Sequence, residues 1–264
     1  MKKYINKFIT ITTQTISNLT GIQIIFYKRD LDAAKMSTRY LLKTVRYIKQ
    51  LSNFVPKNIF EIGANFGQDA EFLRTQFNLK SKNIYVFEPH PVLYKKIKNN
   101  YSFNCYGLAV SDINKDVIFH AVDLKRNNGV SSLKVHKYND EGIYTGIKVE
   151  TIRMDYFISK NNIKSVDFVK IDVEGLTYEV LKGFGKEIKK VKALQIETEF
   201  APIWKGQKTW ETIYNLLKSK DFQLVDYELQ EDGLQADSFW IQKEHVKHLS
   251  YNLGKNKWKK VYLS

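Results

Sequence analysis

A glycine-containing turn and a later acidic residue are the features of this sequence with the clearest chemical meaning. The turn, Gly63-Ala64-Asn65-Phe66-Gly67, follows an apolar run that predicts a strand and precedes a run that predicts a helix. Glycines there let the backbone bend sharply and let a ligand approach the peptide groups. Glu88 stands twenty-one residues after Gly67, at the end of the next predicted strand, where a carboxylate can accept hydrogen bonds from both hydroxyls of an adenosine ribose. Together they predict a site for an adenosyl cofactor.

The spacing of the glycines narrows the choice of cofactor. A nicotinamide dinucleotide needs the G-x-G-x-x-G fingerprint, which brings its pyrophosphate onto the helix N-terminus. Counted from Gly63, the second and third glycine positions hold Asn65 and Gln68, and no Gly-Lys-Ser/Thr follows to form a P-loop. The run Glu61-x-Gly63-x-x-x-Gly67 instead has the acidic-x-Gly-x-x-x-Gly form of class I methyltransferases, in which a carboxylate lies near the methionine end of the cofactor. We therefore interpret the turn as a site for S-adenosylmethionine.

A second run, Asp167-Phe168-Val169-Lys170-Ile171-Asp172-Val173-Glu174-Gly175, resembles the hallmark segment of FkbM-type methyltransferases. Shorter pieces agree with that family in order and spacing: Phe87-Glu88-Pro89, Ala109-Val110-Ser111-Asp112, Gly129-Val130-Ser131-Ser132-Leu133 and Val180-Leu181-Lys182-Gly183. The resemblance extends over residues 58–242. It implies a Rossmann-like class I fold and methyl transfer to oxygen, usually of a hydroxyl on a sugar, a glycolipid or a polyketide. The expected cofactor-binding residues are Glu61, Gly63, Ala64, Asn65, Gly67, Glu88, Asp172 and, by position alone, Ala109.

The chemistry of such a transfer points to the acids of the hallmark segment. An in-line displacement at a sulfonium methyl group mainly needs alignment of the reactants and exclusion of water. A sugar hydroxyl also needs its proton removed or its alkoxide stabilised. Asp172 ends a predicted strand beside the cofactor and Glu174 lies in the turn that follows, so both are candidate catalytic residues, with Asp172 preferred.

Two further acids, Glu197 and Glu199, end the next predicted strand and are expected across the crevice from Asp172. Carboxylates at the ends of adjacent strands suit a hard divalent ion such as magnesium, which can lower the pKa of a bound hydroxyl. Asp172 and Glu197 are therefore candidate metal ligands. The alternative is that Glu197 and Glu199 bind substrate hydroxyls or cap a neighbouring helix.

Histidines are the other candidates for a general base near neutral pH. His120, in a predicted strand just before a long loop, joins the catalytic candidates, and His136 lies within that loop. His90 is expected to cap a helix. Aromatic side chains that could stack on a sugar ring, or serve as core anchors instead, are Trp204, Trp210 and Tyr144.

Alternating strand and helix patterns must position these residues. Short β-rich runs lie at residues 58–62, 84–88, 103–108, 117–122, 168–172, 193–199, 223–228 and 239–242. Helical patterns lie between several of them, at residues 68–76, 92–99, 176–182 and 209–218. The alternation predicts an α/β fold with a mainly parallel central sheet flanked by helices, whose carboxyl edge carries the site. The glycine-containing segment 123–146 predicts a long loop that shapes the substrate site.

The chain divides by pattern into three parts. Residues 1–55 form a basic extension, in which apolar residues at helical spacing between positions 31 and 54 predict a helix packed on the catalytic body. Residues 56–242 form the methyltransferase domain, and residues 243–264 form a basic tail.

Charge and composition limit the partners and the location of the protein. The net charge of +14 divides into +8 over residues 1–50, +5 over residues 243–264 and only +1 over the rest. A nearly neutral body argues against nucleic acid as partner. The basic ends are either solvated or contact an anionic membrane surface or an acidic glycan assembly. One cysteine excludes an internal disulfide, and no export signal or membrane span is recognisable, so we predict a cytoplasmic protein with peripheral contact at the inner membrane face as an option.

Other functions stay open beside sugar O-methylation. An NAD-linked sugar oxidoreductase shares the sheet and the acidic ribose ligand, but its glycine fingerprint is broken and Tyr94-Lys95 has the wrong spacing for a Tyr-x-x-x-Lys pair. A non-catalytic scaffold is disfavoured by the presence of both Asp172 and Glu174. A protein or small-molecule hydroxyl could replace the sugar of a polysaccharide or glycolipid as acceptor. Metal dependence and oligomeric state are left open.

Overall fold

The computed structural model describes residues 34–51, 54–123, 130–137, 144–230 and 233–246. The chain divides into two compact units, Met1–Thr38 and Arg39–Ser264. All elements below lie in the second unit, except that helix α2 begins in the first. Among the described residues, no helix is both long and apolar enough to span a membrane.

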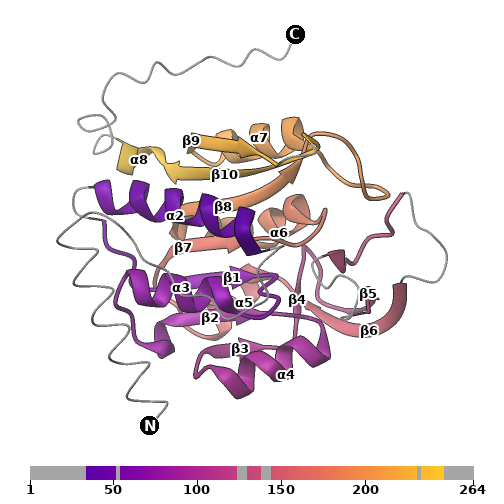
Figure 1. The fold of residues 1–264 in the computed structure, drawn as a ribbon. Helices are drawn as coiled ribbons and strands as arrows, with labels where there is room; N and C mark the ends of the chain where they lie inside the picture. Colours follow the sequence, from indigo (N-terminus) through magenta and orange to yellow (C-terminus); the bar gives the residue numbers. More distant parts are fainter. Residues whose placement is uncertain (1–33, 52–53, 124–129, 138–143, 231–232, 247–264) are drawn as a thin grey trace. The chain divides into compact units, whose positions relative to one another are not determined.

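A seven-stranded sheet forms the centre of the second unit (Figure 1), with the strand order β3-β2-β1-β7-β8-β10-β9. Its strands are β1 Ile59–Ile62, β2 Ile84–Phe87, β3 Asn104–Tyr106, β7 Val166–Ile171, β8 Val191–Glu199, β9 Phe222–Leu229 and β10 Gln235–Gln242. β10 runs antiparallel to β8 and β9, and the other neighbouring pairs are parallel. From β1 the chain builds the sheet outward to β3 and then returns to β7 on the other side of β1. Parallel α/β sheets bind ligands in the crevice beyond the carboxyl ends of strands at such a switch point.

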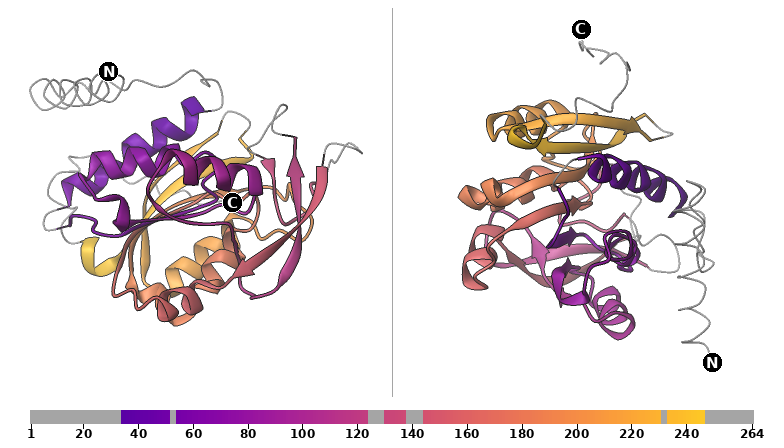
Figure 2. Two further views of the ribbon diagram at one scale, coloured as in Figure 1. Left: turned by 90° about the horizontal axis from the view of Figure 1, so that it is seen from below. Right: turned by 90° about the vertical axis from the view of Figure 1, so that its left-hand side faces the viewer.

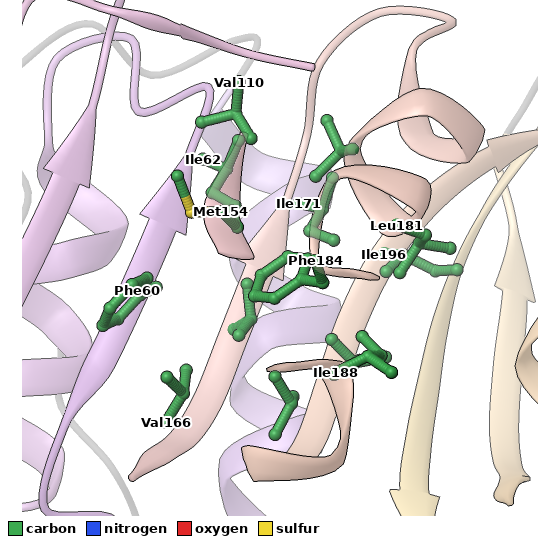
Figure 3. Close-up of a cluster of buried hydrophobic side chains, with 14 of the residues drawn as sticks. Phe60, Ile62, Val110, Met154, Val166, Ile171, Leu181, Phe184, Ile188 and Ile196 are labelled. Atoms are coloured by element: carbon green, nitrogen blue, oxygen red, sulfur yellow. The ribbon is translucent and has the colours of Figure 1, made fainter. Parts of the chain in front are cut away.

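Helices cover both faces of this sheet (Figure 2). One face carries α2 Ala34–Gln50, α3 Gln68–Gln76 and α4 Pro91–Asn100, whose apolar residues share a buried cluster with β1, β2 and β10. The other carries α5 Met154–Lys160, α6 Thr177–Gly183 and α7 Trp210–Ser219. Figure 3 shows the cluster on this second face, where Phe60 and Ile62 of β1 meet Phe184 and Met154. Short elements complete the set: η1 Ser81–Asn83, η3 Gly185–Lys190 and α8 Lys243–Val246.

Alternation along the strands decides which side chains reach which face. Phe60 and Ile62 belong to the cluster under α5 and α6, while Ile59 belongs to the cluster under α2 and α3. Successive strand residues point to opposite faces. Glu61 and Lys170, which lie between residues of the first cluster, therefore face the α3 side.

A smaller sheet of three strands, in the order β4-β6-β5, lies beside the carboxyl edge (Figure 1). Its strands are β4 Ala109–Val110, β5 Asp116–Val122 and β6 Tyr144–Ile152. β6 was not expected from the sequence, and the predicted loop 123–146 is wrong at its end, where β6 begins at Tyr144. The exposed Lys148 and Glu150 make this strand look polar, but β5 pairs with it along its whole length and stabilises it. The rest of that loop is described only for residues 130–137.

The architecture confirms the predicted α/β fold with a mainly parallel sheet. Each predicted strand and helix of the catalytic body has a counterpart, shifted by a few residues at most, whereas β4, β6 and α5 were missed. In α2, Leu41, Val45 and Ile48 are buried with Ile59 and Phe239 of the sheet, as expected for a helix packed on the body. The division into extension, domain and tail stays a prediction, since residues 1–33 and 247–264 lie outside the described part.

Candidate functional site

The glycine turn after β1 lies directly against the end of β7. Gly63 adopts a φ of +80°, and a Cβ added to it would fall 1.8 Å from the carbonyl oxygen of Asp172. The amide of Asp172 in turn donates to the carbonyl of Ile62 at 2.9 Å. Only glycine permits this contact of backbone with backbone. The predicted cofactor turn and the predicted catalytic acid are therefore held side by side by the main chain.

Glu88, directly after β2, is fixed by the backbone on both sides. Its Oε2 accepts a hydrogen bond from the amide of Asn65 at 2.7 Å, and its Oε1 accepts one from the amide of His90 at 2.8 Å. Burial raises the pKa of Glu88 to about 7, against the opposing effect of these two amides. Each carboxylate oxygen has a second acceptor site, so this geometry suits recognition of a diol. His90 caps α4 as expected, since its Nδ1 accepts from the amide of Val92 at 3.2 Å.

Glu61 points to the start of α3 beneath the turn. It is buried, and its Oε2 accepts a hydrogen bond from the amide of Ala70 at 2.9 Å. Burial and the nearby Asp69 hold the pKa of Glu61 well above its ordinary range, although Lys170 and the amide act in the opposite direction. Its predicted place near the methionine end of the cofactor stays a prediction.

Lys170 is a buried cation at the centre of the site that the sequence analysis did not single out. Its Nζ lies 3.0 Å from Oδ2 of Asp172 and 3.0 Å from Oδ2 of Asp69, and its side chain is only 4% exposed. Burial alone would lower the pKa of Lys170, but the carboxylates of Asp172, Asp69 and Glu61 outweigh it and hold that pKa well above its ordinary value. The signal was available, because Lys170 precedes Asp172 by two residues and shares its face of the strand.

Three carboxylates converge at the ends of β7 and β8. Asp172, Glu174 and Glu197 each place one oxygen within 4.8 Å of the others, and all three are half-buried. Asp237 of β10 stands opposite Glu197 in the antiparallel pair. Burial, followed by the charge of Asp172, raises the pKa of Glu174 and Glu197 well above the ordinary range and that of Asp237 to about 7. These acids resist simultaneous ionisation because like charges at this distance repel one another.

Glu199, the other acid predicted at the end of β8, is buried behind this group. Burial raises its pKa to about 7, and the amide of Gly175 acts against that shift. Glu197 is also held, because Gln230 donates to its Oε1 and Thr177 donates to its backbone carbonyl at 2.8 Å. The structure thus brings Asp172 and Glu197 together across the crevice and adds Glu174. Whether they bind metal or substrate stays a prediction.

Residues 130–137 form a crossing segment over this edge. On one side His120 of β5 and Ser132 exchange backbone hydrogen bonds of 2.7 and 3.1 Å. On the other, the amide of Lys137 donates to Ile203 and the amide of Lys205 donates to Val135. His120 is half-buried, and the contacts described for it are backbone contacts, so its catalytic role stays a prediction.

The aromatic candidates and Ala109 take structural positions. Trp204 is buried with its ring at 90° to that of His136 and a centroid separation of 5.0 Å, while Trp210 stacks on Phe200. Trp210 belongs to the buried cluster under α5 and α6, and a sugar-binding role of Trp204, Trp210 or Tyr144 stays a prediction. Ala109 is buried in β4, and its cofactor contact stays a prediction.

The sheet order, the glycine turn and the acids at the strand ends define a Rossmann-like protein of the class I methyltransferase type. The chain belongs to the FkbM methyltransferase family, whose domain model matches residues 61–224. This confirms the resemblance carried by the hallmark segment and by the turn after β1. The protein is therefore a methyltransferase.

Two relatives found by sequence agree with this assignment. The chain is 28% identical over 198 residues to the 2-O-methyltransferase NoeI of Sinorhizobium fredii, covering 70% of this chain and 79% of that protein. It is 27% identical over 145 residues to the hexuronic acid methyltransferase AglP of Haloferax volcanii, covering 53% of this chain and 54% of the relative. The crystal structure of an FkbM methyltransferase from Methylobacillus flagellatus is similar over 70% of this chain and 43% of that one, with 15% identity and a TM-score of 0.47. The chain thus spans only about half of AglP and less than half of the crystallised protein.

Proposed function

We propose that the protein transfers the methyl group of S-adenosylmethionine to a hydroxyl of a sugar in a polysaccharide or glycolipid. The observation that supports the proposal is the backbone contact between Gly63 and Asp172, because it brings the glycine turn after β1 against a group of carboxylates. The names of NoeI and AglP, a 2-O-methyltransferase and a hexuronic acid methyltransferase, support an oxygen acceptor and a sugar. A small-molecule or protein hydroxyl is the alternative acceptor.

The cofactor half of the site is assigned to the turn and to Glu88. In this proposal the ribose hydroxyls bind the Glu88 carboxylate, and the methionine part follows the turn that contains Gly63, Ala64, Asn65 and Gly67. Donation from two hydroxyls favours the charged form of a carboxylate. Binding should therefore lower the pKa of Glu88 from its value of about 7 in the free protein. Ala109 is proposed at the adenine side.

The acceptor half is assigned to Asp172 and Glu174. The sugar oxygen attacks the sulfonium methyl group, the carbon–sulfur bond breaks with its electron pair left on sulfur, and the hydroxyl proton passes to a carboxylate. We assign Asp172 as that base, because its Oδ2 is held by Lys170 and its backbone is locked to β1. A rigid base satisfies the alignment that this displacement needs. His120 remains the second candidate.

A divalent cation such as magnesium is proposed at Asp172 and Glu197, with Glu174 as a third ligand. Three carboxylates with oxygens within 4.8 Å of one another match the ligand type of a hard cation. Burial, and after it the repulsion between the carboxylates, raises the pKa values of Glu174 and Glu197, and either such a cation or bound protons would relieve both effects. When bound, the cation would stabilise negative charge on the acceptor oxygen.

The cofactor assignment is tested by calorimetric titration of the purified protein with S-adenosylhomocysteine and, separately, with NAD. Binding of S-adenosylhomocysteine alone, lost in Glu88→Ala and retained in the exposed control Glu211→Ala, supports the proposal. Binding of NAD would instead support the alternative of an NAD-linked oxidoreductase. Binding of neither ligand would leave a non-catalytic scaffold.

Contact of the basic ends with an anionic membrane surface, and a cytoplasmic location, stay predictions. Most of the net positive charge lies in residues 1–33 and 247–264, which are outside the described part of the chain. Cosedimentation with vesicles containing phosphatidylserine, at low and at high salt, tests the contact. Salt-sensitive binding is expected if the ends supply the attraction.

A further inference from the structure

The turn that carries Glu174 adopts an unusual backbone conformation. Glu174 has a φ of 48° and Gly175 a φ of +83°, so two successive residues lie in the left-handed region. A residue with a side chain enters this region at a cost in free energy, which the surrounding contacts must offset. The conformation of Glu174 is therefore imposed by its neighbours and not by its own preference.

One neighbour is Ser132 of the crossing segment. Its hydroxyl donates to the carbonyl oxygen of Glu174 at 2.6 Å and accepts a hydrogen bond from the amide of Lys134 at 3.0 Å. The side chain of Ser132 is buried, so water does not replace these bonds easily. Ser132, in the crossing segment, and Glu174, in the turn after β7, are forty-two residues apart in the sequence.

The second neighbour is Glu199, behind the same turn. The amide of Gly175 stabilises the charged form of the Glu199 carboxylate, which is buried at the end of β8. The peptide unit between Glu174 and Gly175 is thus held at its carbonyl by the Ser132 hydroxyl, and its amide favours the charged form of the Glu199 carboxylate. A Cβ added to Gly175 would lie 2.4 Å from the Trp204 ring, so the unit has no room to rotate toward that side.

We infer that Ser132 clamps the Glu174–Gly175 peptide at its carbonyl, and that Ser132 is a positioning residue for the acceptor half of the site. The clamp fixes the direction in which the Glu174 carboxylate leaves the turn, toward Asp172 and Glu197. The hydrogen bonds described for Ser132 run to Glu174, Lys134 and His120, and not to the turn after β1. Loss of its hydroxyl therefore disturbs methyl transfer to the acceptor and leaves cofactor binding intact. Only one part of the inference rests on the proposed function, namely the role of Glu174 in the acceptor half of the site.

The chain offers a matched control in the adjacent serine. The hydroxyl of Ser131 accepts a hydrogen bond from the amide of Val122 at 3.0 Å and thus ties the same segment to β5, away from Glu174. Ser132→Ala removes the clamp, Ser131→Ala removes a tether of similar strength, and Ser132→Cys keeps the volume while it weakens the donor. If Ser132→Ala loses activity because of the space it leaves, Ser132→Cys should regain that activity. If the activity is lost because the hydrogen bond is missing, Ser132→Cys should not regain it.

The first measurement is amide hydrogen exchange of the full chain, followed in peptides that contain residues 172–176. We expect exchange in Ser132→Ala and Ser132→Cys to be faster by about tenfold, as for the loss of one buried hydrogen bond, and unchanged in Ser131→Ala. Unchanged exchange in Ser132→Ala, or an equal increase in both alanine variants, would overturn the clamp. This readout needs no acceptor.

The second measurement is methyl transfer from S-adenosylmethionine to a methyl hexoside and a methyl hexuronoside, with titration of S-adenosylhomocysteine on the same samples. Both Ser132 variants should lose about tenfold in kcat with the dissociation constant of S-adenosylhomocysteine unchanged within about twofold. Equal losses in kcat and in cofactor affinity would reduce Ser132 to a structural role. If the wild-type protein methylates neither sugar, the proposed acceptor class fails, while hydrogen exchange still decides the clamp.

Discussion

The ammonium group of Lys170 lies 3.0 Å from the carboxylate of Asp172, and both residues come from the same strand end. The same nitrogen reaches Asp69 in the first turn of α3, so one buried cation joins the strand that carries the proposed base to the helix that follows the cofactor turn. A buried ammonium is stable only while its partners remain, and the partners depend on it equally.

Replacement of Lys170 by methionine should therefore destabilise the protein strongly. The variant leaves Asp69 and Asp172 without their counter-charge in a buried setting, and the expected loss is about 3–5 kcal/mol in the free energy of unfolding. Urea denaturation measures it. Lys182→Met is the control, because that lysine pairs with Asp112 at the surface and should cost about 1 kcal/mol or less. Similar losses in the two variants would show that Lys170 is not a buried charge.

Cofactor affinity should depend on pH through Glu88. Its pKa of about 7 in the free protein means that the carboxylate, which binds the ribose in our proposal, is the minor form at pH 6 and the major form at pH 8. The dissociation constant of S-adenosylhomocysteine should thus be about tenfold higher at pH 6 than at pH 8. Glu88→Gln should bind more weakly and with a flat profile over this range. A flat profile in the wild-type protein would contradict the role given to the charged form.

The same shift has a consequence for stability, with a defined sign. Because the pKa of Glu88 is raised on folding from 4.5 to about 7, its contribution to stability is full below about pH 4.5 and is lost as the pH rises through 7. Glu88→Gln should remove this dependence. The measurement is the unfolding temperature of both proteins between pH 5 and pH 8. Relative to the wild-type protein, the unfolding temperature of Glu88→Gln should increase toward pH 8.

Two glycines with similar backbone angles should respond differently to alanine. In Gly63→Ala the new Cβ meets the backbone of Asp172 at 1.8 Å, whereas Gly206, with a φ of +70°, has nothing within 4 Å of that position. We expect Gly206→Ala to lose about 1–2 kcal/mol, the cost of the left-handed conformation alone. Gly63→Ala should lose more than that and should also lose binding of S-adenosylhomocysteine. Chemical denaturation gives the ranking, and equal losses would contradict the close contact of the two chain segments.

Removal of divalent ions tests the acidic group. If magnesium occupies it, dialysis against EDTA should abolish methyl transfer, magnesium should restore it, and Glu197→Gln should raise the magnesium concentration for half-activation by about tenfold or more. Glu228→Gln serves as the control, since that acid lies on β9 and pairs with Arg39 and Lys43 of helix α2. Full activity in EDTA would mean that Glu174 and Glu197 are neutralised by protons instead.

Features that depend on residues close together in the sequence were predicted, whereas features that depend on contacts between distant residues were not. The strands, the cofactor turn and the acids after β2, β7 and β8 are local patterns, and the rule that parallel strands end at one edge brought Asp172 and Glu197 together. β6 was missed because its alternation includes charged residues and a glycine, and only pairing with β5 makes it a strand. Helix α5 was also missed, although α6, which has the same length of seven residues, was predicted.

The parts of the site that the sequence did not reveal depend on long-range contacts. Lys170 contacts Asp69, about a hundred residues away in the chain, and Ser132 contacts Glu174 from the crossing segment. Asp237 joins the acidic group only because β10 enters the sheet between β8 and β9 and runs against β8. No local pattern specifies that register.

The position of β10 also governs the order in which the protein can form during its synthesis. β9 leaves the ribosome before β10, yet its partner in the sheet is β10, so β9 has to wait for a strand that is made later. Until then β8 presents an unpaired edge with Glu197 and Glu199 on it. The nascent chain therefore carries the complete glycine turn after β1 before the strand next to Glu197 and Glu199 is in place, and this lasts until β10 has emerged.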